Sequence, residues 1–284
     1  MKINVIGGGP AGLYFALLNK AAAPATEITV FERNRADDTF GFGVVFSDET
    51  LGHFRDADAA TYDEIVAQFA YWDEIDTVFK GRTVRSTGHG FCGMSRKRLL
   101  GILQRRAETL GVSIRYETDI SEPEAFRDAD LVVAADGVNS LFRQRYADSF
   151  RPTVEMRPNR FVWLGSRAPL DAFTFIFKED PQGGIWAVHA YRYEEGLATL
   201  IVETTEQAWR DAGMDTASEA ETVAYVSALF AEELGGHEIL TNRSLWRAFP
   251  NVHCQHWRHE NVVILGDAAH TAHFSIGSGT KLAM

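Results

Sequence analysis

The chain has 284 residues, of which 45% are hydrophobic and 24% are charged, as in ordinary globular proteins. Its net charge of −11 argues against non-specific binding to nucleic acid or to an anionic membrane, while one anionic cofactor can still be held by local geometry. Cys92 and Cys254 form no metal-binding spacing, and no segment reads as a signal peptide or a membrane span. We therefore expect a metal-free cytoplasmic enzyme with free thiols.

The first elements of the chain are predicted to be a strand over residues 2–6, a helix over 10–20 and a strand over 27–32. The first apolar run ends at Gly7, where a glycine-rich turn begins. A strand, a turn, a helix and a second strand within about 30 residues are typical of a βαβ unit, in which the two strands are parallel.

The segment that follows has fewer regular patterns. We expect irregular structure over residues 33–60. A helix is predicted over 95–110, because its leucines fall on one stripe and Gly111 supplies a stop. Strands are predicted over 112–118 and 130–135, and the second has the continuous apolar run of a buried parallel strand.

The character of the sequence changes after residue 150, where short runs of alternating residues predict an antiparallel sheet. In the run over residues 185–193, His189 and Tyr191 share one face, while apolar residues occupy the other. A helix with a capping box is then predicted to run as far as Gly235.

A last strand is predicted over residues 261–265, and it has the continuous apolar run that is typical of the buried parallel strands in the first part of the chain. The chain therefore divides into a discontinuous α/β domain and an inserted, sheet-rich substrate domain. The α/β domain is predicted to comprise residues 1–150 and 255–284, and the substrate domain residues 151–254.

The glycine turn at residues 7–12, GGGPAG, has the GxGxxG pattern of a dinucleotide-binding loop. In such a loop the first glycine permits a tight turn, Gly9 lets a pyrophosphate approach the backbone, and Gly12 lets the helix pack on the strand. The helix N-terminus attracts phosphates, and Pro10 suits its first turn. Glu32 ends the next strand and can accept hydrogen bonds from a ribose diol, which predicts FAD or NAD rather than NADP.

Two further acidic residues follow predicted parallel strands. Asp136 and Gly137 come after one of them, and Gly266 and Asp267 come after the last. Open α/β sheets bind ligands at this end of their strands. A dehydrogenase of the NAD type does not need these additional loops, whereas a longer dinucleotide that spreads across the sheet can use them.

The three loops together resemble the fingerprints of single-component flavin-dependent aromatic hydroxylases of the p-hydroxybenzoate hydroxylase type. GGGPAG with Glu32 is similar to the ADP-binding motif, DGVNSLFR from Asp136 to the DG motif, and GDAAH from Gly266 to the GD motif. Arg96 matches an Arg-x-x-Leu helix start that reaches the pyrophosphate. GFGVVFSDETL, HAYRY and HFSIGSGTK look like the branch with salicylyl-CoA 5-hydroxylase, anthraniloyl-CoA monooxygenases and the violacein-pathway hydroxylase, although Phe274 stands where the wider family usually has proline.

The resemblance implies a Rossmann-like FAD-binding domain with an inserted, mostly antiparallel β-sheet substrate domain. It implies FAD as cofactor, NAD(P)H as transient reductant, and transfer of one oxygen atom of O2 to an aromatic ring through a C4a-hydroperoxyflavin. The implied substrate is an aryl-CoA thioester such as salicylyl-CoA or anthraniloyl-CoA. Three alternatives stay open: a hydroxylase of a free indole or phenol, a flavin reductase or oxidase, and a non-catalytic FAD-binding domain of a larger chain.

The motifs and the resemblance assign the cofactor contacts to glycine turns, acidic residues and helix starts: Gly7, Gly9, Pro10, Ala11, Gly12, Glu32, Arg33, Gly43, Arg96, Asp136, Gly137, Gly266, Asp267, Gly277, Gly279, Thr280 and Lys281. Expected substrate contacts are Val45, His189, Tyr191 and Phe274, although His189 can equally be a satisfied core histidine. No residue is assigned a catalytic role. The basic residues that can meet CoA phosphates, or simply be solvated, are Arg82, Arg85, Lys97, Arg105 and Arg106.

Two glycine-containing segments are expected beside the flavin ring. Residues 41–45 resemble a mobile loop of the family, and Gly277 and Gly279 precede a helical pattern whose backbone amides face the flavin in that family. A helix N-terminus is a suitable donor for the negative charge of a reduced flavin. Since the family continues beyond residue 284, we expect a truncated polypeptide or, alternatively, a natural fragment.

Overall fold

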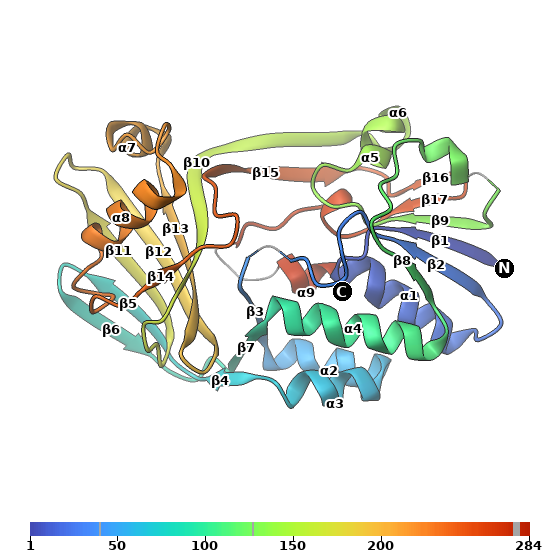
Figure 1. The fold of residues 1–284 in the computed structure, drawn as a ribbon, viewed down its shortest axis with the longest axis horizontal. Coiled ribbons are helices and arrows are strands. Elements are labelled where there is room, and N and C mark those ends of the chain that lie inside the picture. The colour runs from blue at the N-terminus through green and yellow to red at the C-terminus, as the bar shows by residue number, and fades with distance from the viewer. Residues whose placement is uncertain (40, 127, 275–278) are drawn as a thin grey trace.

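A computed structural model describes residues 1–39, 41–126, 128–274 and 279–284, and for residues 48–50 it describes the backbone alone. The strands form three sheets, and Figure 1 shows the mainly parallel sheet on the right and the largest sheet on the left. The long strands β10 (Pro152–Ser166) and β15 (Arg247–Cys254) pair with each other and run between these two parts of the molecule.

The first sheet has six strands in the order β16-β17-β9-β1-β2-β8, and all neighbours except β16 and β17 are parallel. Val5 of β1 lies opposite Val30 of β2, so the predicted parallel βαβ unit is confirmed. The strands are β1 Lys2–Ile6, β2 Glu27–Phe31, β8 Ser113–Arg115, β9 Leu131–Ala134, β16 Arg258–His259 and β17 Val262–Ile264.

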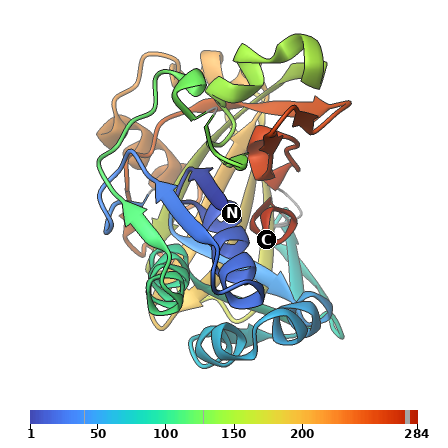
Figure 2. The same cartoon turned by 90° about the vertical axis from the view of Figure 1, so that its right-hand side faces the viewer.

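Helices pack against this sheet, as can be seen in Figure 2, where the right-hand part of Figure 1 faces the viewer. Leu13 and Leu17 of α1 and Leu99 and Leu103 of α4 are fully buried in the core between helices and sheet. Helix α4 ends as predicted at Gly111, whose φ of +93° is the left-handed conformation that glycine adopts without strain. The helices of this part are α1 Pro10–Ala22, α2 Asp48–Ala57, α3 Ala59–Val66 and α4 Arg96–Leu110.

The second sheet has the order β14-β10-β13-β12-β11-β5-β6, with β15 paired to β10. Its neighbours are antiparallel, as the alternating runs predict, except that β11 and β5 are parallel. The remaining strands are β5 Ile75–Phe79, β6 Arg82–Ser86, β11 Phe173–Glu179, β12 Ile185–Glu194, β13 Leu197–Thr204 and β14 Ile239–Leu240.

The two faces of this sheet differ in chemistry. Trp186, Val188 and Ala190 are fully buried on the face that packs against helix α8 (Glu219–Leu229). His189 and Tyr191 alternate with them and lie on the opposite face, as the sequence predicts. The second face therefore carries the polar and aromatic side chains.

A third, small sheet corrects one expectation. Residues 33–60 were expected to be irregular, but Gly43–Ser47 form strand β3 and residues 48–57 form α2. Strand β3 pairs with β7 (Phe91–Ser95), which also pairs with β4 (Ala70–Trp72). The valines and the phenylalanine of β3 are buried, so tertiary packing outweighs the local glycine signal.

Helix α8 has the predicted capping box of Ser218 and Glu221, but it ends at Leu229 rather than at Gly235. The apolar residues that suggested the longer helix, Phe230 and Leu234, are still buried, because successive turns carry them into the same core. The shorter elements are η1 Pro123–Phe126, α5 Leu141–Arg145, α6 Ala147–Phe150, α7 Glu206–Asp211, η2 Gly266–Ala268 and α9 Gly279–Ala283.

Strands β5 and β6 join the second sheet although residues 75–86 precede the predicted boundary at residue 150. The division into residues 1–150 with 255–284 and residues 151–254 stays a proposal, and this pairing argues for assigning residues 75–86 to the sheet-rich part. In the part of the chain that the structure describes, no helix combines the length and apolar character needed to cross a membrane.

Candidate functional site

The three predicted loops meet at one edge of the parallel sheet. Strands β1, β9 and β17 are neighbours and run in the same direction. Gly7, Asp136 and Asp267 each follow the carboxyl end of one of these strands. The sheet therefore brings together three segments that are far apart in the sequence, at the edge where open α/β sheets bind ligands.

The glycines of the first loop have different physical roles. Gly7 has a φ of +105°, and a Cβ there would lie 2.3 Å from the carbonyl oxygen of Ala135. A Cβ on Gly12 would lie 2.0 Å from the carbonyl oxygen of Gly7. A Cβ on Gly9 would meet no atom of the described residues within 4 Å. Gly7 and Gly12 are thus required by the fold, while Gly9, the residue before α1, borders open space.

Glu32 holds the first loop in place. One carboxylate oxygen accepts a hydrogen bond from the Gly8 backbone N–H at 2.7 Å. The other accepts from the backbone and side-chain nitrogens of Asn34, at 2.7 and 2.6 Å. Each carboxylate oxygen has two lone pairs, and Asn34 uses both of those on one oxygen. The oxygen that accepts from Gly8 has one lone pair left, which can receive a diol hydroxyl. Arg33, beside it, is exposed.

Asp136 has a polar atom that the protein leaves unsatisfied. Its Oδ2 accepts from the backbone N–H of Leu141 at 2.8 Å and of Phe142 at 3.4 Å. Its Oδ1 is buried, and among the described residues it has no hydrogen-bond partner. Burial raises the pKa of the Asp136 carboxyl, against hydrogen bonds from Ser140 and Leu141 that lower it. A hydroxyl donor of a ligand would satisfy this oxygen.

Arg143 connects the second and third loops and was not assigned to the site from the sequence. Its side chain is 5% exposed, and burial lowers its pKa. The guanidinium donates to the carbonyl oxygens of Val138 at 2.5 Å and Ala268 at 3.0 Å. In the sequence, only its position in the motif DGVNSLFR pointed to a role for Arg143. Its hydrogen-bond acceptors are backbone carbonyl groups, which a pattern of side chains does not reveal.

Asp267 and Arg96 form the charged part of the site. Asp267 is exposed, but the protein atoms around its carboxyl displace part of its hydration and raise its pKa, while the nearby positive charges of Arg96 and His270 lower it. Arg96 is half-buried, and its loss of hydration lowers its pKa, while the negative charge of Asp267 opposes this shift. The start of α4 thus places a half-buried cation near the third loop, and the Arg96 backbone N–H donates to the Phe42 carbonyl at 2.8 Å.

The last helix, α9, lies beside the first. Gly266 has a φ of +59°, and a Cβ there would lie 3.0 Å from the Cβ of Ala11 and 3.6 Å from that of Ala283. A Cβ on Gly279 would meet nothing within 4 Å, as at Gly9. Two other predicted contacts, Thr280 and Lys281, lie on this helix, where Lys281 Nζ is 3.5 Å from Ser47 Oγ. The predicted contact at Gly277 lies outside the described residues.

Gly43 is enclosed by the second sheet. Its N–H donates to Thr199 Oγ1 at 2.9 Å, and its carbonyl accepts from the Tyr191 hydroxyl at 2.9 Å. A Cβ on Gly43 would lie 2.5 Å from the Cβ of Tyr193. The segment expected to be a mobile loop is therefore, from Gly43 on, a buried strand held by side chains of another sheet.

The four predicted substrate contacts separate into two groups. Val45 and Tyr191 are 6% and 5% exposed and pack in one apolar cluster with Trp72. Burial raises the pKa of Tyr191 to about 12, and its hydroxyl donates to the main chain. His189 and Phe274 lie together instead, with ring centroids 5.7 Å apart. Only the second pair has an unsatisfied polar atom, Nδ1 of His189.

Glu203 and His273 extend this second group and were not assigned from the sequence. His189 Nε2 lies 3.5 Å from one oxygen of Glu203, and His273 Nε2 lies 3.8 Å from the other. In the sequence, only the alternation of side chains along strand β13 could place Glu203 on the same face of the sheet as His189. Among the described residues, no group of three or more His, Cys, Asp or Glu side chains is arranged to hold a metal.

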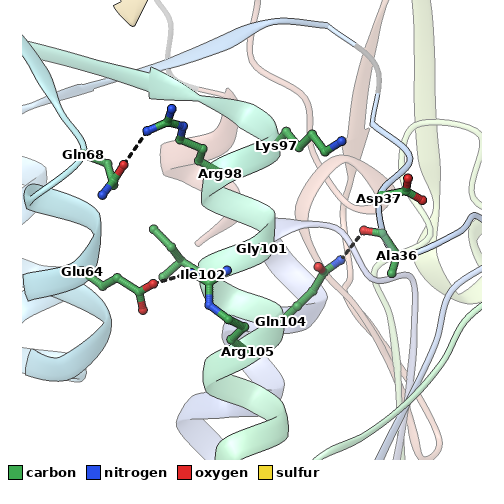
Figure 3. A pocket seen from close by; sticks show the side chains of 10 residues that line it. All are labelled: Ala36, Asp37, Glu64, Gln68, Lys97, Arg98, Gly101, Ile102, Gln104 and Arg105. Carbon is green, nitrogen blue, oxygen red and sulfur yellow. Dashed lines mark hydrogen bonds and ion pairs between the residues drawn. The ribbon is translucent and has the colours of Figure 1, made fainter.

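The basic residues considered for CoA phosphates mostly have carboxylate partners. Arg85 pairs with Asp76, Arg106 with Asp58 and Arg105 with Glu64. A pocket of about 560 Å³ lies along α4. Among its lining residues, drawn in Figure 3, Arg98 donates to Gln68, while no dashed line reaches Lys97. These contacts favour a solvated, ion-paired surface over a preformed phosphate site.

The residues at the sheet edge fit an FAD molecule. Open space at Gly9 and Gly279 lets a ligand approach the starts of α1 and α9, where backbone N–H groups attract phosphates and the electron-rich flavin ring. Glu32 can accept from the ribose, and the orphan oxygen of Asp136 needs a hydroxyl donor. Arg96 supplies positive charge near the third loop.

Comparison with known proteins gives the same assignment. Residues 1–284 match the family described as FAD binding domain. The chain is 43% identical to salicyloyl-CoA 5-hydroxylase of Streptomyces sp., with 100% of this chain and 56% of that protein covered. It is 39% identical to 3-hydroxy-4-methyl-anthranilyl-[aryl-carrier protein] 5-monooxygenase of Streptosporangium sibiricum, covering 100% of this chain and 76% of that protein. The chain thus spans little more than half the length of the first relative.

A solved structure supports the fold. That of 2-methyl-3-hydroxypyridine-5-carboxylic acid oxygenase superposes with a TM-score of 0.78 at 18% identity, and the match covers 99% of this chain and 78% of that one. At this identity the similarity concerns the fold alone. The fold is that of an α/β nucleotide-binding sheet joined to a larger, mostly antiparallel sheet, as the sequence predicts.

Proposed function

Because the chain belongs to the FAD binding domain family, we propose that it is the flavin-binding and substrate-facing part of a monooxygenase that hydroxylates an aromatic ring. The observation that carries the proposal is the convergence of three loops at one sheet edge, with an unsatisfied oxygen on Asp136 and open space at Gly9. The location is proposed to be cytoplasmic, and NAD(P)H and O2 are the proposed co-substrates.

The chain's own residues would bind and orient rather than react. Bound FAD supplies the electron transfer and the activation of O2. Glu32 and Asp136 would accept hydrogen bonds from its hydroxyls, and the starts of α1 and α9 would meet its phosphates and ring edge. The second sheet, whose face carries His189, would cover the ring and limit the access of water.

We propose an aryl thioester as the substrate class. One relative is named for salicyloyl-CoA and another for an anthranilyl group on an aryl-carrier protein, so a thioester-linked aromatic acid is common to both names. The ion-paired basic residues give no separate support for a CoA phosphate site. Recognition would therefore depend on the aromatic ring and the thioester more than on the nucleotide.

The first test of this function is flavin binding followed by turnover. We expect the purified chain to retain or take up FAD, and to oxidise NAD(P)H faster with salicyloyl-CoA than with free salicylate. Isotopically labelled O2 should place one labelled oxygen in the product. NAD(P)H oxidation without product would indicate a reductase or oxidase. FAD binding with no oxidation of NAD(P)H would indicate a non-catalytic flavin-binding part, and failure to bind FAD would contradict the proposal.

A further inference from the structure

The inner face of the second sheet carries one buried acid-base network. The register places Phe161 opposite Glu203 and Ile201 opposite His189, which in turn lies opposite Phe175. These side chains share one face because residues two apart on a strand point the same way. The chain segment after Asp267 brings His273 and Phe274 to this face.

Glu203 is the centre of the network. One of its oxygens lies 3.5 Å from His189 Nε2, and the other lies 3.8 Å from His273 Nε2. Asn159 also donates to Glu203 at 2.8 Å. The side chains of His189 and Glu203 are only 8% and 12% exposed. Such a carboxylate fixes the orientation of the imidazole that it contacts.

Aromatic rings enclose the network. Phe274 lies 4.5 Å from Phe161 and 4.2 Å from His273 between ring centroids, and its ring is nearly perpendicular to that of His189. Phe175 meets the other side of His189 edge-on, with centroids 5.2 Å apart. The acid-base network therefore lies among aromatic side chains, which can pack against another aromatic ring.

The two nitrogens of His189 have different surroundings. Nε2 faces Glu203, so it carries the hydrogen in the neutral tautomer. Nδ1 then has the free lone pair, and it is buried without a hydrogen-bond partner among the described residues. A buried acceptor that lacks a donor is unfavourable. A ligand with an O–H or N–H group on its ring would supply that donor.

We propose that His189, positioned by Glu203, is the proton acceptor for an ionisable hydroxyl or amino substituent on the aromatic substrate. The inference rests on the proposed function, because it places the substrate ring between this face and the flavin-binding loops. In the step, the O–H bond of a phenol breaks, the proton moves to Nδ1, and the electron pair stays on the oxygen. The resulting imidazolium is paired with Glu203, and the more electron-rich ring is the better target for hydroxylation.

The charges around His189 support this assignment. Burial would raise the pKa of Glu203, but hydrogen bonds from His189 and Asn159 and the charge of His273 hold it below its usual value. Glu203 is therefore ionised at neutral pH. Burial lowers the pKa of His273, with Glu203 opposing this shift and the charges of His189 and Arg157 adding to it. Glu203 therefore provides negative charge beside the ring of His189.

Binding without turnover tests the inference. FAD-loaded protein without NAD(P)H is titrated with salicyloyl-CoA and with benzoyl-CoA, which lacks the ring hydroxyl. We expect salicyloyl-CoA to bind about tenfold more tightly or better, because only its ring hydroxyl can donate to the buried Nδ1 of His189. Calorimetry in buffers of different ionisation enthalpy reports the proton that moves.

The variant H189Q separates the roles of the two nitrogens. Its amide can still donate to Glu203 from the position of Nε2, but it has no basic group at Nδ1. We expect it to lose the preference for the hydroxylated ligand, while benzoyl-CoA binding stays within about twofold. E203Q should weaken the preference partially. The exposed His237 provides the matched control, and H237Q should behave as the wild type.

The outcomes distinguish this inference from the proposed function. If wild-type protein hydroxylates its substrate but H189Q and E203Q both keep the preference, the network is not the acceptor. Equal affinity of wild-type protein for both ligands would overturn the inference as well. Absence of NAD(P)H oxidation in the wild-type protein would instead contradict the proposed function, since the binding comparison needs no turnover. If H189Q does not fold, E203Q carries the comparison.

Discussion

At the residue scale, one residue type serves opposite purposes in the first loop. Gly7 and Gly12 are required because the protein itself fills the space where a Cβ would lie. Gly9 borders space that the described residues leave open, so a side chain there would meet a ligand rather than one of those residues. The GxGxxG pattern does not separate these roles, whereas the distances do.

A matched pair of alanine substitutions tests this distinction. Gly12→Ala places a Cβ 2.0 Å from the Gly7 carbonyl oxygen and should lower the free energy of unfolding by about 3 kcal/mol or more. Gly9→Ala should change it by less than about 1 kcal/mol. Its affinity for FAD should nevertheless fall about tenfold, a loss of about 1.4 kcal/mol. Urea unfolding and flavin fluorescence titration measure the two quantities, and equal FAD affinity of Gly9→Ala and wild-type protein would contradict the role of Gly9.

Arg143 gives a second residue-scale prediction. Arg143→Met removes the donor for buried carbonyl groups in the second and third loops and should destabilise the protein by about 2–4 kcal/mol. The control is Arg145→Met, whose side chain is 58% exposed and pairs with Glu124. That change should be less than about 1 kcal/mol. Similar unfolding midpoints of the two variants in urea would show that Arg143 does not hold the loops together.

At the scale of elements, strand β3 shows how the second sheet supports the flavin-binding part. The strand is short and glycine-containing, and in isolation it would be a poor strand. It is ordered by pairing with β7 and by two hydrogen bonds of Gly43, whose N–H donates to Thr199 of β13 and whose carbonyl accepts from Tyr191 of β12. Tyr191 is therefore assigned to the support of β3.

Tyr191→Phe tests that assignment. The variant loses the donor to the buried Gly43 carbonyl and should be less stable by about 1–3 kcal/mol. If Tyr191 only supports β3, KM for the aromatic substrate should stay within about twofold of the wild-type value. Tyr71→Phe, at a residue that is 49% exposed, is the control and should change stability by less than about 0.5 kcal/mol. A large rise in KM with unchanged stability would restore Tyr191 as a substrate contact.

At the scale of the whole molecule, the site depends on how two large sheets are joined. Strands β10 and β15 connect them, and Thr271 receives the Val252 N–H at 2.8 Å, which fixes the segment after Asp267 on β15. The same arrangement buries Tyr14 and Tyr191 and leaves Tyr116 and Tyr225 half-buried. Burial raises the pKa of Tyr14, Tyr116, Tyr191 and Tyr225 to about 12.

These tyrosines predict a loss of stability in alkali. In the unfolded chain a tyrosine loses its proton near pH 10, whereas the folded protein keeps it up to about pH 12. The unfolded state then binds fewer protons, so the free energy of unfolding falls as the pH rises from about 10 to 12. Tyr14→Phe should reduce this slope, and it should not destabilise the protein at neutral pH because the Tyr14 hydroxyl has no hydrogen-bond partner among the described residues. Urea midpoints across this pH range measure both effects, and an unchanged slope would contradict the prediction.

The sequence by itself determined the features that depend on local physics. The βαβ unit, the cap at Gly111, the capping box of Ser218 and the acidic residues after parallel strands follow from residue types at fixed short spacings. Of these features, the βαβ unit and the acidic residues after the strands predict FAD binding, because a phosphate-binding turn and a strand end are each built from neighbouring residues.

Only the tertiary structure decided which distant residues meet. Arg143 donates to a carbonyl 125 residues away, and Tyr191 to one 148 residues away. Glu203 lies between His189 and His273 because the register of one sheet and the path of the last segment bring them together. Such contacts leave no periodic trace in the sequence, since each depends on the packing of whole elements. For the same reason, Glu203 and His273 emerged only from the structure, while His189 and the residues for the cofactor were already visible in the sequence.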